Sequence, residues 1–389
     1  MFSVIPPVGV PFGWRAVFPK ADHTGRFASV LGEQLGGGCI LTSSGKAALW
    51  LALSAMHAER PDRDEIILPD YTCWTVPSAT VRAGLKVKPV DLESVTLGLD
   101  PEKVRPAITD RTLAVIAPHL FGVPSRIDEI ESICREKDVF LIDDAAQAYG
   151  AILHGRPIGG FGDSGVLSFG RGKNITTGNG GAVIFRNAAI HRQAEHIAQR
   201  DLSDQHGSLA DKFQMAVYKC FFSRGLFWIP ASMPFLKLGE TVYDLSFDLS
   251  RMSPDRAGRG LLMLETYGRV LFHRQEVAAA YRERLAAIRA LNILTLQPNT
   301  AGADLRFPVI LADKQKRPSI LSQGRKLGIS GMYPDTISSV GELRPHLIPG
   351  DPCPISRLVA DQLVTLPTHQ GISLVDVDTI CRFLMSATK

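Results

Sequence analysis

The stretch Ser168-Phe169-Gly170-Arg171-Gly172-Lys173-Asn174 decides how this chain of 389 residues is interpreted. It places one lysine in a polar loop between two apolar runs, residues 166–169 and 180–185, which are typical of strands. The glycines beside Lys173 let the backbone approach a bulky group. An isolated loop lysine is usually solvated, so the segment indicates chemistry only if a partner lies elsewhere in the chain.

The partner is the acidic segment Leu141-Ile142-Asp143-Asp144-Ala145-Ala146-Gln147-Ala148, which precedes the lysine. Residues 139–142 suit a buried parallel strand, and ligands bind at the carboxyl ends of such strands. One alternative is that the two aspartates cap a helix that begins at Ala145. Together with Lys173, however, the segment predicts pyridoxal phosphate. The aldehyde of this cofactor needs an amine to hold it as a Schiff base, and its ring nitrogen needs a carboxylate to stay protonated. We therefore predict Lys173 and Asp144 as the catalytic pair, both in contact with the cofactor.

A third motif, Leu41-Thr42-Ser43-Ser44-Gly45-Lys46-Ala47-Ala48-Leu49, changes abruptly from small residues to good helix formers. Residues 43–46 should therefore begin a helix, whose free amides and dipole attract an anion. An ordinary serine cap is the alternative for this motif alone. Because the cofactor carries a phosphate, we expect Gly45 and Lys46 to hold it, with the Ser168 hydroxyl as a further ligand.

Further motifs follow in order along nearly the whole chain: Leu68-Pro69-Asp70-Tyr71-Thr72, Pro118-His119-Leu120-Phe121-Gly122, Arg251-Met252-Ser253 and Thr365-Leu366-Pro367-Thr368-His369. In this arrangement the chain resembles the DegT/DnrJ/EryC1/StrS family of pyridoxal-phosphate-dependent sugar aminotransferases. The resemblance implies a fold-type-I α/β transferase with a mostly parallel large-domain sheet, helices on both of its faces and a smaller C-terminal α/β domain. It also implies a homodimer. The implied reaction moves an amino group from glutamate to a keto sugar that is linked to a nucleotide, in the biosynthesis of surface polysaccharides or secondary metabolites.

The resemblance also implies that Gln147 hydrogen-bonds the ring oxygen of the cofactor. Three positions depart from the family pattern. Lys46 stands where threonine is usual, and Leu249 stands where an asparagine reaches the phosphate across the dimer. Cys73 stands where the family has an aromatic residue that stacks on the cofactor ring. We therefore expect Trp74 or Tyr71 to provide the stacking side chain.

His119, Tyr333 and Arg251 are weaker candidates for substrate contacts; His119 could instead contact the cofactor, and Arg251 could instead belong to an interface. A pyridoxal-dependent sugar dehydratase is one alternative activity, but Lys173 argues against it because that branch of the family carries histidine instead. A non-catalytic, membrane-associated descendant that binds or regulates is the alternative from another class, suggested by the altered positions.

Two domains are expected, a large cofactor-binding domain over residues 1–245, with an apolar insertion at about 215–240, and a linking helix and small domain over 246–389. Strand-like runs at 65–68 and 113–117 alternate with helical patterns such as 127–137. Beyond the boundary, we expect a long helix over 259–290, a strand over 305–310, and helices at 318–327 and from 374 onward.

Composition excludes some classes of function. The net charge of +4 comes with no dense basic cluster, so no nucleic acid is expected as a partner. Six scattered cysteines suggest a reducing, cytoplasmic compartment. Because they are not grouped with histidines, we expect no metal site. The opening residues 1–7 lack the features of a signal peptide. Residues 215–236 are apolar but interrupted by Lys219, Arg224 and prolines, and would either lie on the inner face of a membrane or form an oligomer interface or lid.

Overall fold

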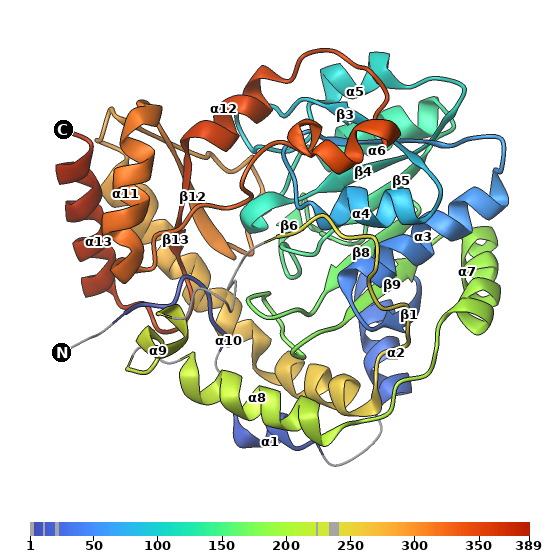
Figure 1. The fold of residues 1–389 in the computed structure, drawn as a ribbon, viewed down its shortest axis with the longest axis horizontal. Helices are drawn as coiled ribbons and strands as arrows, with labels where there is room; N and C mark the ends of the chain where they lie inside the picture. The colour runs from blue at the N-terminus through green and yellow to red at the C-terminus, as the bar shows by residue number, and fades with distance from the viewer. Residues whose placement is uncertain (1–3, 11, 20–22, 223–224, 233–240) are drawn as a thin grey trace.

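A seven-stranded sheet forms the centre of the computed structural model, which describes residues 4–10, 12–19, 23–222, 225–232 and 241–389 (Figure 1). Strand β9 runs antiparallel to both neighbours, whereas the β3–β2, β2–β4, β4–β5 and β5–β8 pairs are parallel. The mostly parallel sheet is therefore confirmed. In spatial order the strands are β1 (Gly38–Thr42), β9 (Gly181–Phe185), β8 (Ser164–Ser168), β5 (Phe140–Asp144), β4 (Thr112–Pro118), β2 (Glu65–Pro69) and β3 (Lys86–Val90).

Helices cover both faces of this sheet, as expected. Successive residues of a strand point to opposite faces, so Leu141 of β5 packs into one core while Phe140 and Ile142 pack into the other. This explains why the strands are continuous apolar runs rather than alternating ones. One face carries α2 (Thr24–Leu35), α5 (Pro101–Ala107) and α6 (Ile127–Glu136), and the other carries α3 (Gly45–Glu59), α4 (Thr75–Arg82) and α7 (Ala188–Asp201).

The long helix α10 (Pro254–Leu285) connects this sheet to a second core. It begins five residues earlier than expected because Ser253 and Pro254 provide a helix start ahead of the apolar pattern. Its first half packs Met263 on the large sheet, and its second half packs Tyr281 into the C-terminal core. The boundary predicted at 245 stays a prediction.

The C-terminal core surrounds a three-stranded antiparallel sheet in the order β10-β12-β13. Its elements are β10 (Leu291–Ile293), β12 (Arg306–Leu311), α11 (Arg317–Gly324), α12 (Pro354–Gln362), β13 (Leu363–Pro367) and α13 (Leu374–Ala387). A small third sheet joins β6 (Ile152–Leu153), β7 (Arg156–Pro157) and β11 (Thr300–Ala301).

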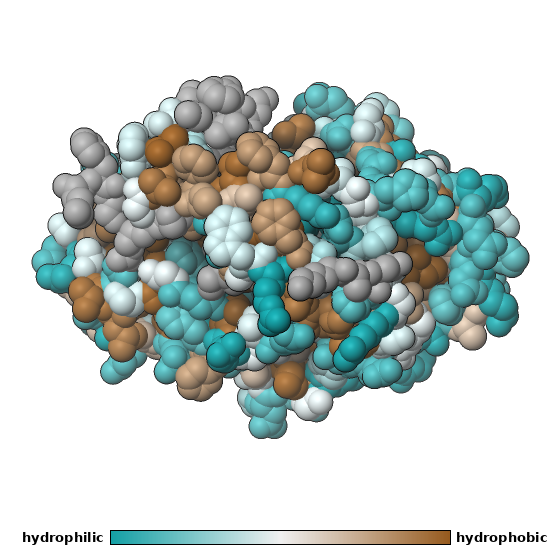
Figure 2. All heavy atoms as spheres, turned by 90° about the horizontal axis from the view of Figure 1, so that it is seen from below, coloured by the Kyte–Doolittle hydropathy of each residue, from teal (hydrophilic) through white to brown (hydrophobic). Residues whose placement is uncertain are grey.

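The apolar stretch contains the second half of α8 (Leu209–Phe221), which packs against α1 (Trp14–Val17), and the short helix α9 (Trp228–Ala231). Residues 223–224 and 233–240 are outside the described part. On α8, Tyr218 is buried and its ring stacks on that of Phe12 with centroids 6.0 Å apart. Phe213 on the same helix is 72% exposed. Figure 2 shows apolar side chains gathered on this underside of the molecule, bordered by hydrophilic ones. Among the described helices, none combines the length and the apolarity that crossing a bilayer requires.

Candidate active site

One cavity of about 340 Å³ brings together most of the predicted site residues. It lies where β5 and β8 end beside the start of α3. Of the predicted residues, it is lined by Gly45, Lys46, His119, Asp144, Gln147, Ser168, Lys173 and Tyr333. It is also lined by residues that sequence analysis did not assign to the site, including Thr72, Cys73, Arg171, Asn179 and Met332.

Asp144 is held at the carboxyl end of β5, between Pro118 of β4 and Val166 of β8. The segment that follows is a turn over 146–150, so the helix-cap alternative for the two aspartates is wrong. One carboxylate oxygen, Oδ1, accepts a hydrogen bond from the Ala146 amide at 3.0 Å. Burial raises the pKa of Asp144, against the opposing effects of this bond and of the Lys173 charge. A cationic group bound in the cavity would lower the pKa of Asp144 again and favour its ionised form.

Asp143 and His119 form a separate, structural pair. His119 Nδ1 accepts from the Ser125 amide at 2.9 Å, which leaves Nε2 to donate to Asp143 Oδ1, also at 2.9 Å. The other oxygen of Asp143 accepts from the amides of Gly159 and Phe161. Both nitrogens of His119 are thus occupied, and its ring serves as a wall of the cavity.

Lys173 lies in a tight turn at the end of β8. Its amide donates to the Gly170 carbonyl at 3.2 Å, and Gly172 has a φ of +83°, which a residue with a side chain rarely adopts. The next residue, Asn174, donates from Nδ2 to the carbonyl of Gln147 at 3.2 Å and so fastens the lysine loop to the acidic segment. Burial lowers the pKa of Lys173 and the charge of Arg306 lowers it further, whereas Cys73 and Asp144 raise it. The net direction favours the neutral, nucleophilic amine.

Gln147 is held from two sides. Its Oε1 accepts from the Phe121 amide at 2.9 Å, and its Nε2 donates to the Tyr333 hydroxyl. Phe121 adopts a φ of 63°, so this amide is presented by a backbone conformation uncommon for a bulky residue. A side-chain amide has two N–H donors, and one remains for a ligand in the cavity.

The start of α3 forms the opposite end of the cavity. Ser44 is the N-cap and accepts from the Ala47 amide at 3.2 Å, while the Ala48 amide donates to the Ser44 carbonyl. The first two helical amides, those of Gly45 and Lys46, make no hydrogen bond within the described residues. A Cβ added to Gly45 would lie 2.9 Å from the Ser168 Cβ, so only glycine allows this approach. The predicted helix start is confirmed, and its geometry is that of an anion site.

The Lys46 side chain turns away from these amides. Its Nζ lies 3.5 Å from Asp244 Oδ2 and 4.9 Å from the centre of the Phe247 ring. The backbone amide of Lys46, rather than its ammonium group, is therefore the part that faces an anion at the helix start.

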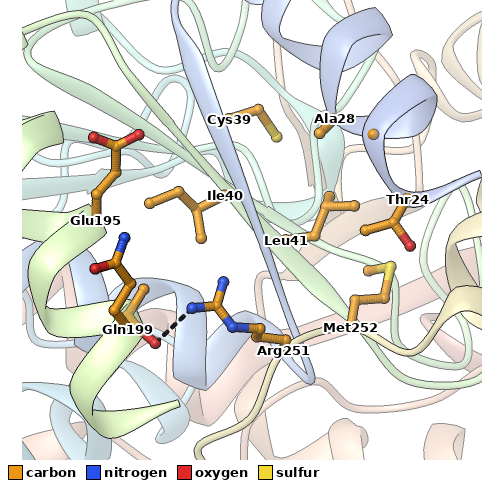
Figure 3. Close-up of a pocket in the computed structure, with 11 residues that line it drawn as sticks. Thr24, Ala28, Cys39, Ile40, Leu41, Glu195, Gln199, Arg251 and Met252 are labelled. Atoms are coloured by element: carbon orange, nitrogen blue, oxygen red, sulfur yellow. Dashed lines mark hydrogen bonds between the residues drawn. The ribbon is translucent and has the colours of Figure 1, made fainter. Parts of the chain in front are cut away.

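Two predicted residues do not line the cavity. The indole of Trp74 donates to the Asp335 carbonyl at 3.3 Å, and Cys73 is the residue that faces the cavity instead. Arg251 lines a separate surface pocket of about 280 Å³ (Figure 3), where its guanidinium donates to the Ala198 carbonyl at 2.9 Å. The backbone of Arg251 bridges to Thr42 beside the start of α3, so the segment supports the site without presenting its side chain to it.

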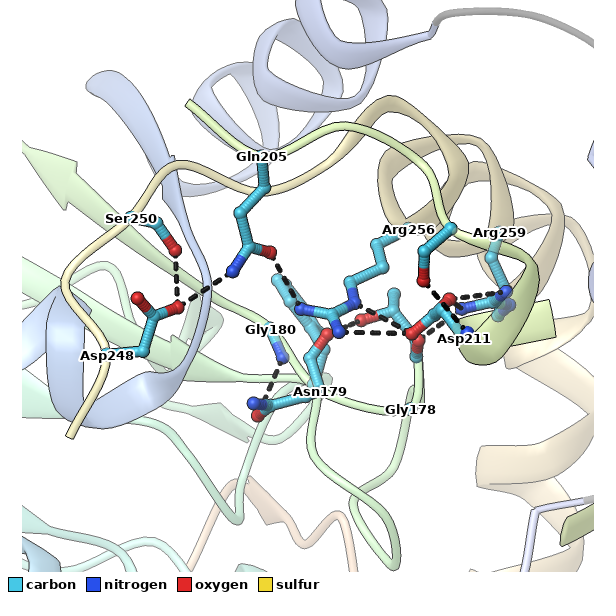
Figure 4. Close-up of polar contacts among 12 residues, drawn as sticks. Gly178, Asn179, Gly180, Gln205, Asp211, Asp248, Ser250, Arg256 and Arg259 are labelled. Atoms are coloured by element: carbon cyan, nitrogen blue, oxygen red, sulfur yellow. Dashed lines mark hydrogen bonds and ion pairs between the residues drawn. The ribbon is translucent and has the colours of Figure 1, made fainter. Parts of the chain in front are cut away.

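A buried ion network supports the far end of the lysine loop (Figure 4). Arg259 of α10 is fully buried and donates to Asp211 of α8 at 3.1 Å and to the carbonyls of Thr177 and Ala16. Arg256 bonds the other oxygen of Asp211, also at 3.1 Å. Three segments far apart in sequence are thereby joined behind the loop that carries Lys173.

Comparison with known proteins identifies the family. The sequence profile of the DegT/DnrJ/EryC1/StrS aminotransferase family matches residues 17–385. The chain belongs to this family. Among similar proteins is an L-glutamine:2-deoxy-scyllo-inosose aminotransferase of Micromonospora echinospora, 41% identical over 181 residues, which are 46% of this chain and 42% of that protein. The chain therefore matches less than half the length of that relative. An uncharacterized protein of Methanocaldococcus jannaschii is 30% identical over 77% of this chain and 70% of its own length.

Solved structures of similar proteins share the fold. DesI, crystallised in the presence of its TDP-sugar product, superposes with a TM-score of 0.78 at 22% identity, over 100% of this chain and 94% of that one. The GDP-4-keto-6-deoxy-D-mannose-3-dehydratase of E. coli with bound hydrated PLP gives a TM-score of 0.78 at 18% identity, over 99% and 100% of the two chains. At these identities the likeness shows the fold, and the expected fold-type-I architecture of the DegT/DnrJ/EryC1/StrS family is confirmed.

The cavity of this family member fits pyridoxal phosphate. It contains an amine whose pKa is lowered, a buried carboxylate, and a helix start with uncommitted amides beside the close contact of Gly45 and Ser168. These are the groups that an aldehyde, a pyridine nitrogen and a phosphate require. In this cavity Lys173 would hold the aldehyde, Asp144 the ring nitrogen, and the amides of Gly45 and Lys46 the phosphate.

Proposed function

We propose that the protein is a pyridoxal-phosphate-dependent aminotransferase that moves an amino group from an amino acid to a keto sugar or a related cyclic ketone. The observation that carries this proposal is the placement of Lys173 and Asp144 in one cavity beside the start of α3. Family membership supports the reaction class.

When bound, pyridoxal phosphate supplies a cationic ring that withdraws electrons from the Cα of an amino acid. The residues of the chain have separate tasks around it. Asp144 would keep a proton on the ring nitrogen, because its buried carboxylate would be stabilised by the positive charge beside it. Lys173, whose pKa is lowered by burial, would be the base that takes the proton from the donor Cα. Gln147 uses its remaining N–H to orient the ring.

The donor and the acceptor are narrower proposals. Glutamate is the donor that the family resemblance suggests, and the name of the Micromonospora relative supports L-glutamine as a second candidate. The same name supports a carbocyclic ketone as a second candidate acceptor, in addition to a nucleotide-linked keto sugar. Both acceptors present ring hydroxyl groups and a ketone, so one cavity can be tested against both.

A homodimer is also proposed, and the exposed apolar side chains around α8 are the surface that supports it. Leu209 and Phe213 of α8 are 84% and 72% exposed, and Trp14 of α1 is 54% exposed. Such a patch more often marks a protein partner than a solvated surface. The membrane-surface alternative gains no support, since Lys219 lies over the rings of Phe12 and Trp14 and donates to the Phe12 carbonyl.

Borohydride reduction after loading with pyridoxal phosphate tests the proposal. Mass spectrometry of the digested protein should find the reduced cofactor on the peptide that contains Lys173. The Lys46→Ala variant, which removes another lysine of the cavity, should be labelled to the same extent as the wild type. Attachment to Lys46, or no attachment at all, would refute the assignment. Loaded protein is then mixed with glutamate or glutamine, and the loss of absorbance of the bound aldehyde reports the first half of the reaction.

A further inference from the structure

The six cysteines of the chain have different surroundings in the structure. Burial raises the pKa of four thiols, to about 11 for Cys381 and to about 12 for Cys39, Cys134 and Cys353. These four thiols stay protonated at neutral pH, whereas the thiolate is the form that reacts with oxidants. The two remaining cysteines are Cys73, which is partly exposed, and Cys220, which is exposed on α8.

Cys73 lies on the wall of the candidate cofactor cavity, which it shares with Lys173 and Asp144. It comes directly before the N-cap of α4, and its Sγ is 2.9 Å from the Oγ1 of Thr75, the first residue of that helix. Either atom of this pair can donate, so the Thr75 hydroxyl can donate to a thiolate. Partly exposed cysteines beside cationic side chains are those that react most readily, and Arg171 also lines this cavity.

A second hydroxyl beside Cys73 has no assigned partner. Thr72 lines the same cavity and is 1% exposed, and its Oγ1 makes no hydrogen bond within the described part of the chain. A buried hydroxyl without a partner is costly, so a polar group introduced beside it would be stabilised. A thiol is a weak hydrogen-bonding group, whereas an oxygen bonded to the same sulfur both donates and accepts well. The surroundings of Cys73 therefore favour an oxidised sulfur.

We propose that Cys73 is a site of reversible oxidation by peroxides, and that its oxidation closes the cavity to the cofactor. The sulfur attacks one peroxide oxygen, so an S–O bond forms while the O–O bond breaks. The thiol proton goes to the departing oxygen, which leaves as water or an alcohol, and the product is a sulfenic acid. The sulfur loses two electrons and the peroxide gains them. A thiol reductant reverses the step, because one thiol displaces the hydroxyl group as water and a second releases the Cys73 thiol.

Oxidation of Cys73 and binding of the cofactor should exclude each other. The added oxygen takes up space in a cavity of about 340 Å³ whose wall also carries Lys173 and Asp144. Bound pyridoxal phosphate would fill the same space and shield the sulfur. Thermodynamic linkage requires that the two effects accompany each other. The inference adds a regulatory modification to the chain, and its second half rests on the proposed cofactor site.

The first experiment measures where hydrogen peroxide reacts. Protein with and without pyridoxal phosphate is treated for increasing times and then unfolded in dimedone, which traps sulfenic acids, and mass spectrometry quantifies each cysteine peptide. Without cofactor, Cys73 should be labelled. With cofactor at about a hundred times its Kd, the rate at Cys73 should fall about 100-fold, because only the unoccupied protein reacts. Cys220 is the internal control, and its rate should be the same in both samples.

The second experiment measures cofactor binding after the peroxide has been removed. Absorbance titration of oxidised wild type should give a Kd for pyridoxal phosphate raised about tenfold or more, since an extra atom in a filled site is costly. Dithiothreitol should restore the original Kd. In Cys73→Ser, treated and untreated protein should bind the cofactor alike, whereas Cys220→Ser should lose affinity on treatment as wild type does. Circular dichroism verifies folding, and Cys73→Ala replaces Cys73→Ser if the latter is not folded.

Four results would overturn the inference. These are no labelling of Cys73 in cofactor-free protein, labelling of Cys73 that the cofactor does not slow, an unchanged Kd after Cys73 has been oxidised, or an equal loss of affinity in treated Cys73→Ser. Untreated wild type that binds no pyridoxal phosphate would instead refute the proposed function, and closure of the cavity to the cofactor with it. In that case the dimedone experiment would still decide whether peroxide oxidises Cys73.

Discussion

Gln147 and Tyr333 are joined by a buried hydrogen bond although they are 186 residues apart in the chain. The Gln147 amide nitrogen donates to the Tyr333 hydroxyl, and its oxygen is held by the Phe121 backbone. A residue of the C-terminal part thus sets the direction in which the remaining N–H of Gln147 points. Sequence analysis named both residues but gave no reason to connect them.

Tyr333→Phe should weaken the binding of pyridoxal phosphate about tenfold, because an outer partner that orients a ligand-binding group typically has an effect of this size. The dissociation constant is measured by absorbance titration. Tyr71→Phe is the matched control, since the Tyr71 ring lies 5.6 Å from that of Tyr333 and its buried hydroxyl has no partner in the described structure. Equal losses in the two variants would show that packing, and not the bond to Gln147, is responsible.

Asp144→Asn should raise the stability of the cofactor-free protein at neutral pH. Burial raises the folded-state pKa of Asp144, so the folded protein binds this proton more tightly than the unfolded chain, whose carboxyl has a pKa near 3.8. The charged carboxylate therefore destabilises the fold increasingly as pH rises from that value through the folded pKa. The difference in Tm between Asp144→Asn and wild type should be positive at pH 7 and should vanish at low pH. A difference of the same size at both pH values would contradict this account.

The same variant should slow the first half-reaction about 100-fold or more, since an amide does not hold a proton on the ring nitrogen. Cofactor binding should persist. The measurement is single-turnover absorbance with excess donor, and Asp143→Asn is a poor control because Asp143 bonds His119 and two backbone amides. Unchanged single-turnover rates in Asp144→Asn would remove this residue from its proposed role.

Lys46→Ala should change the affinity for pyridoxal phosphate less than about threefold, because the side chain pairs with the partly exposed Asp244 and the amide at the helix start is retained. Ser168→Ala should weaken binding by roughly tenfold, which corresponds to one hydrogen bond to a charged group. Fluorescence titration of both variants gives the comparison. A larger loss of affinity in Lys46→Ala would show that the ammonium group of Lys46 binds the phosphate.

Phe213→Asp should convert a homodimer into monomers if the exposed side chains around α8 form the interface. Sedimentation velocity at several concentrations measures the change. Phe272→Asp on α10 is the matched control, since Phe272 is also well exposed, at 64%. Dimers that persist in Phe213→Asp, or monomers in the wild type, would exclude this surface as the dimer interface. Binding of wild type to anionic vesicles, lost in the variant, would favour the membrane alternative.

Local sequence was sufficient to predict strands β2, β4, β5, β8, β9 and β12, the start of α3, and the cavity positions of Lys173 and Asp144. Each of these depends on residues that are close together in the chain, such as the apolar run before Asp144 or the small residues before α3. Trp74 was misplaced because the direction of a side chain depends on its contact with Asp335, which is distant in sequence. Arg251 does not line the cavity either, because its guanidinium donates to the carbonyl of Ala198, which is also distant in sequence.

The burial of Arg306 was not predicted, although a signal for it was visible in the sequence. The run Leu305-Arg306-Phe307-Pro308-Val309-Ile310 is apolar except for one arginine, and a charge inside a buried strand requires a partner or a ligand. Sequence analysis assigned the strand correctly and did not examine the charge. Only the structure shows that the hydrogen bonds of its guanidinium to described residues go to the hydroxyls of Ser330 and Thr365.

The contact between Arg259 and Asp211 also limits how this protein can be engineered. Residues of the apolar insertion look dispensable, and trimming α8 is an obvious way to improve solubility. The deletion would take Asp211 away and leave a fully buried guanidinium uncompensated beneath the lysine loop. Loss of one partner of a buried ion pair costs about 3–5 kcal/mol, a large part of the stability of a typical domain. A soluble variant is therefore better obtained by replacing the exposed face of α8 while Asp211 is retained.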